Sequence, residues 1–186
     1  MVDLGTGTGQ AVLRRARQKP DELVIGIDPD AQAMAESSRR AAANPRKGGL
    51  PNAIFLVASA EDLPGPLLCL ADEVTIVLPW GSLLKSVLTA DEQLLSNLRA
   101  LLTPNGEAAI LVSTTDRDAA SVGIKLANAA DAQRLACRLE SAGLQLVECR
   151  EATESDVSRL SSAWGKRLGI PQRRTAWLFR LRQRRD

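Results

Sequence analysis

Short apolar runs alternate along this chain with longer stretches of helical periodicity. The short runs are rich in Val, Ile and Leu and predict seven strands, at about 2–4, 23–28, 53–58, 73–79, 107–113, 144–150 and 175–182. The periodic stretches predict helices at about 9–18, 30–43, 91–102 and 130–142, with shorter ones near 65–70, 82–88 and 155–167. Strands that alternate with helices are typical of repeated strand–helix–strand units. The pattern therefore predicts an α/β fold built on a parallel sheet.

The length and composition fit one soluble domain. The chain has 186 residues, of which 45% are hydrophobic and 25% are charged, close to ordinary globular usage. This length predicts a single domain over residues 1–186. No apolar run approaches the roughly 20 residues that span a bilayer. Because the chain enters its first strand without a leader sequence, we expect it in the cytoplasm.

The cysteines and the lack of histidine limit the kinds of catalytic and metal site that the chain can form. The three cysteines, Cys69, Cys137 and Cys149, lie far apart in the sequence, and the chain has no histidine. The cysteine spacing indicates neither a disulfide framework nor a zinc site, so we expect reduced, buried thiols and no bound metal. The lack of histidine excludes histidine-based triads, histidine metal ligands and imidazole general bases.

Basic residues gather in three places although the net charge is only +2. Residues 166–186 hold eight of them, including Lys166, Arg167 and Arg174, against the single acid Asp186. The other two clusters are Arg14, Arg15, Arg17 and Lys19, and Arg39, Arg40, Arg46 and Lys47. Such clusters suit a polyanionic partner such as a nucleic acid. On charge alone, a solvated, arginine-rich surface is the simpler explanation, because charge runs are usually just surface.

The strongest motif is a glycine-rich turn over residues 3–9, between a short predicted strand and a helix. Its sequence is DLGTGTG, and glycines there let the backbone turn tightly and approach a ligand closely. Asp28 ends the next predicted strand, where a carboxylate accepts both hydrogen bonds of a ribose diol. The turn and Asp28 together indicate an adenosine-containing ligand.

Asp3, the first residue of this segment, helps to distinguish between two kinds of adenosine cofactor. A carboxylate there attracts the cationic methionine end of S-adenosylmethionine, whereas a dinucleotide site places pyrophosphate near the helix start. Glu61, after the third predicted strand, is a further candidate beside the adenine. A purely structural explanation remains open, because Asp3 and Glu61 could stabilise turns and Asp28 could cap a strand end.

Tryptophans mark the predicted substrate side. Trp80 follows the fourth predicted strand in LPWGS, and ligands of open parallel sheets bind outside such strand ends. Trp164 lies in a polar, basic stretch, where a large apolar ring is harder to explain as core. Either ring could stack on a base or pack in the core. Trp177, inside the last predicted strand, is interpreted as packing.

Six segments carry a family resemblance. DLGTGTG, IGIDP, NPRKGGLPN, ASAEDLP, LPWGSLL and SSAWGKRL, in this order, resemble the KamB and NpmA type of aminoglycoside-resistance methyltransferase. The resemblance covers nearly the whole chain. It implies a Rossmann-like class I fold, with a seven-stranded, mostly parallel sheet, helices on both faces and a shortened N-terminus. It also implies that stretches 114–130 and 153–172 are linkers on the substrate side.

The resemblance further implies the reaction and the partner. Enzymes of this type use S-adenosylmethionine to methylate N1 of adenine 1408 of 16S ribosomal RNA in the assembled 30S subunit, act as monomers, and confer kanamycin and apramycin resistance. Adenine N1 has an in-plane lone pair and no proton at neutral pH, so the reaction needs no histidine base. Two alternatives are a related methyltransferase acting on transfer RNA or a small molecule, and a non-catalytic remnant that binds RNA or cofactor.

Site residues follow from the same resemblance, position by position. The cofactor set comprises Asp3, Gly5, Gly7, Asp28, Ala60, Glu61 and Ser82. The catalytic set, in which two tryptophans sandwich the flipped adenine, comprises Pro79, Trp80, Ser162 and Trp164. The RNA-docking set comprises Arg39, Arg40, Arg46, Lys47, Lys166, Arg167 and Arg174.

Overall fold

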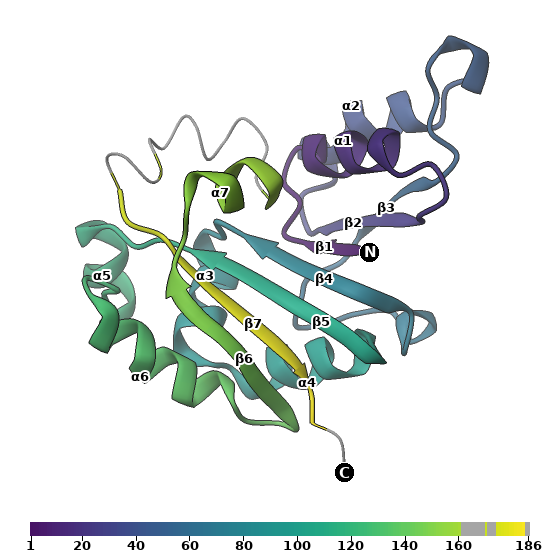
Figure 1. Cartoon of the computed structure of the whole chain (residues 1–186). Helices are drawn as coiled ribbons and strands as arrows, with labels where there is room; N and C mark the ends of the chain where they lie inside the picture. The colour runs from purple at the N-terminus through teal and green to yellow at the C-terminus, as the bar shows by residue number, and fades with distance from the viewer. Residues whose placement is uncertain (161–169, 171–173, 185–186) are drawn as a thin grey trace.

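The computed structural model describes residues 1–160, 170 and 174–184, and its core is one seven-stranded sheet (Figure 1). The strands are β1 (Val2–Leu4), β2 (Val24–Asp28), β3 (Ala53–Val57), β4 (Ala71–Val77), β5 (Leu102–Val112), β6 (Leu144–Glu151) and β7 (Trp177–Gln183). Their order across the sheet is β3-β2-β1-β4-β5-β7-β6. Only β7 runs antiparallel to its neighbours β5 and β6. The sheet is therefore mostly parallel, as predicted.

Helices cover both faces of the sheet. The described helices are α1 (Gln10–Gln18), α2 (Ala31–Ala41), α3 (Gly81–Thr89), α4 (Glu92–Leu101), α5 (Asp116–Val122), α6 (Ala129–Leu139) and α7 (Glu154–Leu160), with 3-10 turns at Pro45–Lys47 and Gly65–Leu67. Helices α3, α4 and α6 pack on one face, and α1, α2 and α7 lie on the other (Figure 1). None of the helices in the described ranges is long and apolar enough to cross a membrane.

The sequence builds these layers through buried apolar faces. The largest cluster joins one sheet face to the apolar sides of α3, α4 and α6, with Phe179 fully buried. Trp177 belongs to the same cluster, which confirms its interpretation as packing. A smaller cluster places Val157 and Leu160 of α7 against Leu111 and Leu178. These contacts fix the strand ends where the predicted ligand residues lie.

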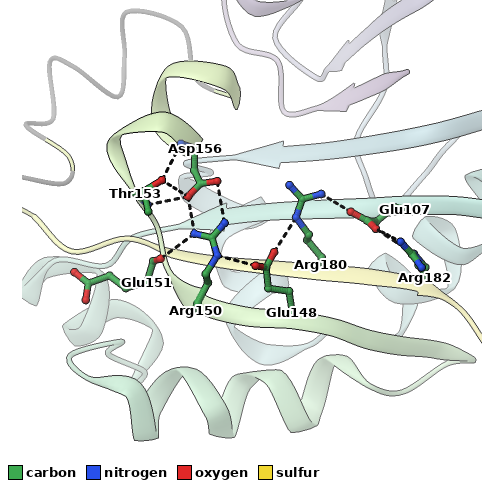
Figure 2. Close-up of polar contacts among 8 residues, drawn as sticks. All are labelled: Glu107, Glu148, Arg150, Glu151, Thr153, Asp156, Arg180 and Arg182. Carbon is green, nitrogen blue, oxygen red and sulfur yellow. Dashed lines mark hydrogen bonds and ion pairs between the residues drawn. The ribbon is translucent and has the colours of Figure 1, made fainter.

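Beyond the apolar cluster under α7, the same sheet face carries charged side chains. Glu107 on β5 pairs with Arg180 and Arg182 on β7, at 2.5 and 3.0 Å. Arg180 also contacts Glu148 on β6 at 3.0 Å, and Glu148 contacts Arg150 at 2.7 Å (Figure 2). Alternating acids and bases thus cross three strands in a continuous network.

Several boundaries differ from the predictions. Strand β5 begins at Leu102 rather than near 107, because the residues between Leu102 and Glu107 form an irregularity in its pairing with β4. Helix α5, within the stretch 114–130, was not predicted, and the predicted helix at 65–70 is a 3-10 turn. The expectation of buried cysteines is wrong, since Cys69 and Cys137 are exposed and Cys149 is only half-buried. A lone cysteine on an amphipathic element carries too little hydrophobicity to fix which way it faces.

Candidate functional site

The glycine-rich turn connects β1 to α1 and is held to the next strand by its backbone. The N–H groups of Gly5 and Thr6 both donate to the Ile27 carbonyl, at 2.8 and 3.1 Å. Gly5, Gly7 and Gly9 all have positive φ, at +72°, +56° and +71°. A side chain would be strained at each position, which explains why this turn is built from alternating glycines.

The glycines differ in what surrounds them. A Cβ on Gly9 would lie 2.4 Å from the Phe55 ring, and one on Gly5 would lie 2.5 Å from Leu83 of α3. A Cβ on Gly7 would meet nothing within 4 Å. Gly9 is therefore needed for packing, and a Cβ on Gly5 would have to displace the end of the Leu83 side chain. Gly7 presents bare backbone to open space, where a ligand can approach it.

Asp3 is a buried acid on β1, an interior strand of the sheet. Its side chain is 4% exposed and accepts a hydrogen bond from Thr75 Oγ1 on β4, at 2.7 Å. Burial raises the pKa of this carboxyl, and the Thr75 hydrogen bond only partly offsets that effect. A cation placed beside Asp3 would relieve the cost of the buried charge.

Asp28 ends β2 with both carboxylate oxygens oriented by backbone. Oδ2 accepts from Gly7 N–H at 2.8 Å, and Oδ1 accepts from Asp30 N–H at 2.9 Å. Each carboxylate oxygen has two lone pairs, so Asp28 can make these strand-end contacts and still accept hydrogen bonds from a ribose diol, as predicted from the sequence. The turn thus orients Asp28 and leaves it acceptor capacity.

Glu61 lies in the loop after β3. Its Oε1 accepts from Ser86 Oγ of α3 at 2.8 Å, and the carbonyl of the preceding Ala60 accepts from Asn97 Nδ2 of α4 at 2.8 Å. Both positions were predicted as cofactor contacts, but Ser86 and Asn97 were not predicted. Nothing in the sequence indicates that two later helices hold this loop.

Trp80 is the most exposed large apolar side chain among the described residues, at 79%. It follows β4 and caps α3, between Leu78 and Gly81, which have φ values of +49° and +61°. Pro79 is buried in the same turn, and Ser82 is exposed in the first turn of α3. This geometry holds the indole outward at a strand end, so core packing does not explain Trp80.

Strand order brings the predicted cofactor residues and Trp80 to one edge of the sheet. Neighbouring strands β3, β2, β1 and β4 carry or precede, in that order, Glu61, Asp28, Asp3 and Trp80. The parallel direction of these four strands places their carboxyl ends together, where open α/β sheets bind ligands. The sheet therefore arranges three acids and one exposed ring in a row.

The predicted RNA-docking residues fall into two different environments. Arg39, Arg40, Arg46 and Lys47 are exposed on and after α2, with Arg39 paired to Glu36. Arg174 is half-buried instead, and its guanidinium donates to Ser113 Oγ at 2.7 Å and to the Ser113 carbonyl at 3.0 Å. Arg174 also lies 3.6 Å from the Asp118 carboxylate, so it holds α5 against the end of β5.

Four predicted residues lie outside the described part of the chain. They are Ser162, Trp164, Lys166 and Arg167. Their proposed roles stay predictions.

The donor set fits an adenosyl cofactor with a cationic amino-acid end. Asp28 supplies acceptors for a diol, Glu61 an acceptor for an amino group, and buried Asp3 an attraction for positive charge. The Thr6 hydroxyl lies in the same turn and, like Thr75, hydrogen-bonds to the Asp3 carboxyl and so lowers its pKa against the effect of burial. The open space at Gly7 gives such a ligand access to the turn.

Known structures share this fold. The crystal structure of the 16S rRNA methyltransferase KamB matches with a TM-score of 0.84 and 32% identity, covering 98% of this chain and 86% of the other. The aminoglycoside-resistance methyltransferase NpmB1 matches with a TM-score of 0.82 and 36% identity, covering 98% and 85%. Another match, from Catenulisporales acidiphilia, is a W203A mutant with cosubstrate S-adenosylmethionine, at a TM-score of 0.79 and 31% identity, covering 99% and 85%. The fold is thus Rossmann-like class I, as predicted.

Sequence comparisons agree with the structural ones. A 16S rRNA (adenine(1408)-N(1))-methyltransferase from Streptoalloteichus hindustanus is 37% identical over 174 residues, which cover 90% of this chain and 79% of that protein. One from Escherichia coli is 30% identical over 180 residues, covering 94% and 82%. The family model described as NpmA, 16S rRNA (adenine(1408)-N(1))-methyltransferase, matches residues 1–182. The chain therefore belongs to the NpmA family of S-adenosylmethionine-dependent 16S rRNA methyltransferases.

Proposed function

We propose that this protein methylates N1 of adenine 1408 in the 16S rRNA of the assembled small ribosomal subunit and thereby confers resistance to kanamycin and apramycin. The observation that carries the proposal is the placement of exposed Trp80 beside the row of cofactor-binding acids. An exposed indole at the ligand-binding end of the strands presents a flat face on which an extruded base can stack.

The residues divide the task between cofactor and base. Asp3, Asp28 and the turn at Gly7 would hold S-adenosylmethionine, which supplies a methyl group as an electrophile when bound. Trp80 would stack on the target adenine and fix the direction of its N1 lone pair toward that methyl group. The indole face also stabilises the positive charge that N1 methylation leaves on the base.

No proton transfer is needed from the protein. Adenine N1 is unprotonated at neutral pH, so the nucleophile is ready once the base has left the helix stack. A chain without histidine can therefore carry out this step by alignment alone. The exposed cluster Arg39, Arg40, Arg46 and Lys47 would dock on RNA phosphates and contribute affinity without reading sequence.

The test is labelled methyl transfer to purified small subunits, followed by reverse transcription across the decoding site. We expect a stop at adenine 1408, because N1 methylation blocks the Watson–Crick edge. Trp80→Ala should lower methylation about 100-fold, while affinity for S-adenosylhomocysteine, measured by calorimetry, stays near wild type. Leu68→Ala is the matched control, since Leu68 is 63% exposed but lies before β4, away from this edge.

Other outcomes would overturn the proposal. Methylation of transfer RNA but not of small subunits would identify a related enzyme with another substrate. Binding of cofactor and RNA without turnover would identify a non-catalytic remnant. Unimpaired methylation by Trp80→Ala would show that the exposed ring does not hold the base.

A further inference from the structure

Helix α3 contacts both ends of the candidate cofactor site. At one end, Leu83 packs so closely on Gly5 that a Cβ there would lie 2.5 Å from its Cδ2. At the other end, one turn further along the helix, Ser86 Oγ donates to Glu61 Oε1 at 2.8 Å. The same helix begins directly after Trp80. A single rigid element therefore connects the glycine turn, the Glu61 loop and the exposed ring.

Helix α4 holds the Glu61 loop from a second direction. Asn97 Nδ2 donates to the Ala60 carbonyl at 2.8 Å. Asn97 is itself oriented by Gln93, whose Nε2 donates to Asn97 Oδ1 at 3.0 Å one helical turn away. Ala60 is buried, so its carbonyl needs a partner, and Asn97 provides it. Two helices thus fix two consecutive residues of a loop that has no regular structure of its own.

A loop carboxylate is a poor recognition group unless something restrains it. A free Glu side chain loses rotamer entropy when it binds a ligand, and that loss lowers the affinity for the ligand. Ser86 removes part of this freedom by engaging Oε1, which leaves Oε2 for a ligand donor. An ionised carboxylate only accepts hydrogen bonds, so it favours a base that presents an amino group over one that presents a carbonyl.

We propose that Ser86 and Asn97 are positioning residues: Ser86 sets how strongly the site distinguishes an adenine from a 6-oxopurine in the bound cofactor, and Asn97 sets the overall affinity by holding the loop. They act through Glu61 and Ala60 and do not touch the cofactor themselves. The proposal rests on the proposed function only in that Glu61 faces the cofactor base. It concerns cofactor binding, which is measurable without RNA.

The experiment compares two probes by calorimetry on the full chain: S-adenosylhomocysteine and S-inosylhomocysteine, its 6-oxo analogue. Wild type should prefer the adenosyl compound, because the 6-oxo group sets an acceptor against the Glu61 carboxylate. Ser86→Ala should reduce that preference about ten-fold, near the lower end of the range expected for one hydrogen bond to a charged group. Ser86→Thr keeps the hydroxyl group, so it should retain most of the wild-type preference.

The matched control is Ser96→Ala, an exposed serine on α4 that neighbours Asn97 in sequence. It should leave the preference unchanged. Asn97→Ala should weaken both probes about equally, by roughly three- to ten-fold, because it frees the loop backbone and exposes an unpaired carbonyl. Thermal unfolding of each variant separates these effects from a general loss of fold.

A double-mutant cycle shows whether Ser86 acts through Glu61. Glu61→Gln should reduce the preference strongly, since an amide donates as well as accepts, and adding Ser86→Ala should then change it little more. Additive effects of the two changes would overturn the proposal, as would an unchanged preference in Ser86→Ala. If neither probe binds wild type, the proposed function itself fails, and that result is distinct from binding without discrimination.

Discussion

The two halves of the sheet use their polar groups in opposite ways. In the cofactor half, β1 to β3, the acids at the strand ends accept from neutral donors: backbone N–H groups for Asp28 and hydroxyl groups for Asp3 and Glu61. In the far half, β5, β7 and β6, acids are paired with arginines, as Glu107 is with Arg180 (Figure 2). The first half keeps acceptor capacity for a ligand, and the second uses its charges internally. Binding and stabilisation are thus separated across one sheet.

The largest expected effect breaks the packing of the cofactor half. In Gly9→Ala, the new methyl group meets the Phe55 ring at 2.4 Å and the residue keeps a φ of +71°. Strain and overpacking together should lower the free energy of unfolding by about 3 kcal/mol, measured by urea denaturation.

Gly7→Ala is the matched control for that change. It carries a similar positive φ but no clash, so the loss of stability should be nearer about 1 kcal/mol. Its methyl group would enter the space assigned to the ligand, so affinity for S-adenosylhomocysteine should fall. Equal destabilisation by the two variants would show that Phe55 yields freely and that packing does not distinguish them.

The next largest effect separates binding from stability at Asp3. Asp3→Asn keeps the shape but removes the negative charge, so affinity for S-adenosylmethionine should fall about 100-fold. The unbound variant should unfold at a higher urea concentration than wild type. Burial raises the pKa of Asp3 above 3.8, so the folded protein binds a proton more tightly than the unfolded chain does.

That sign gives a pH test. Wild type should lose stability as the pH rises from the ordinary Asp pKa through the raised one, and Asp3→Asn should lack this decline. Asp21→Asn, at an exposed acid before β2, should change neither affinity nor the pH profile. Wild-type affinity in Asp3→Asn would show that this carboxylate does not attract the cofactor.

Sequence patterns predicted the cofactor half better than the far half for a physical reason. The turn, Asp28 and Trp80 are local signals, because glycine spacing and strand ends can be read within a few residues. The partner of Asp3 is Thr75, 72 positions away, and only strand register brings the two together. The sequence shows a single threonine in an apolar strand, but it does not indicate which residue that threonine contacts.

The substrate side depended even more on distant contacts. Arg174 was predicted to dock on RNA, yet its side chain bonds to Ser113, 61 positions earlier in the chain. Helix α5 went unpredicted because it has only seven residues and none is buried, so it lacks an apolar stripe. Its Thr115–Asp118 capping box was the one local sign of a helix start.

The smallest expected effect tests the far half through Asp156, at the start of α7. Its carboxylate accepts from Thr153 N–H at 2.8 Å and Thr153 Oγ1 at 2.7 Å, and from Arg150 at 2.6 and 3.0 Å (Figure 2). The Arg150 hydrogen bonds lower the pKa of Asp156 well below its ordinary value of 3.8, although burial opposes them. Asp156→Asn should therefore lower the free energy of unfolding by about 2 kcal/mol at pH 7.

The pH dependence identifies the charge as the cause. A depressed pKa contributes stability that is present above pH 4 and is lost as the pH falls toward the folded value, so wild type and Asp156→Asn should converge at acid pH. Asp116→Asn is the control, because Asp116 also pairs with a base, Lys125, but on the exposed surface, where such pairs contribute little. A difference that persists unchanged at pH 3 would assign the effect to the lost cap geometry, and the far half would then be stabilised by packing rather than by its paired charges.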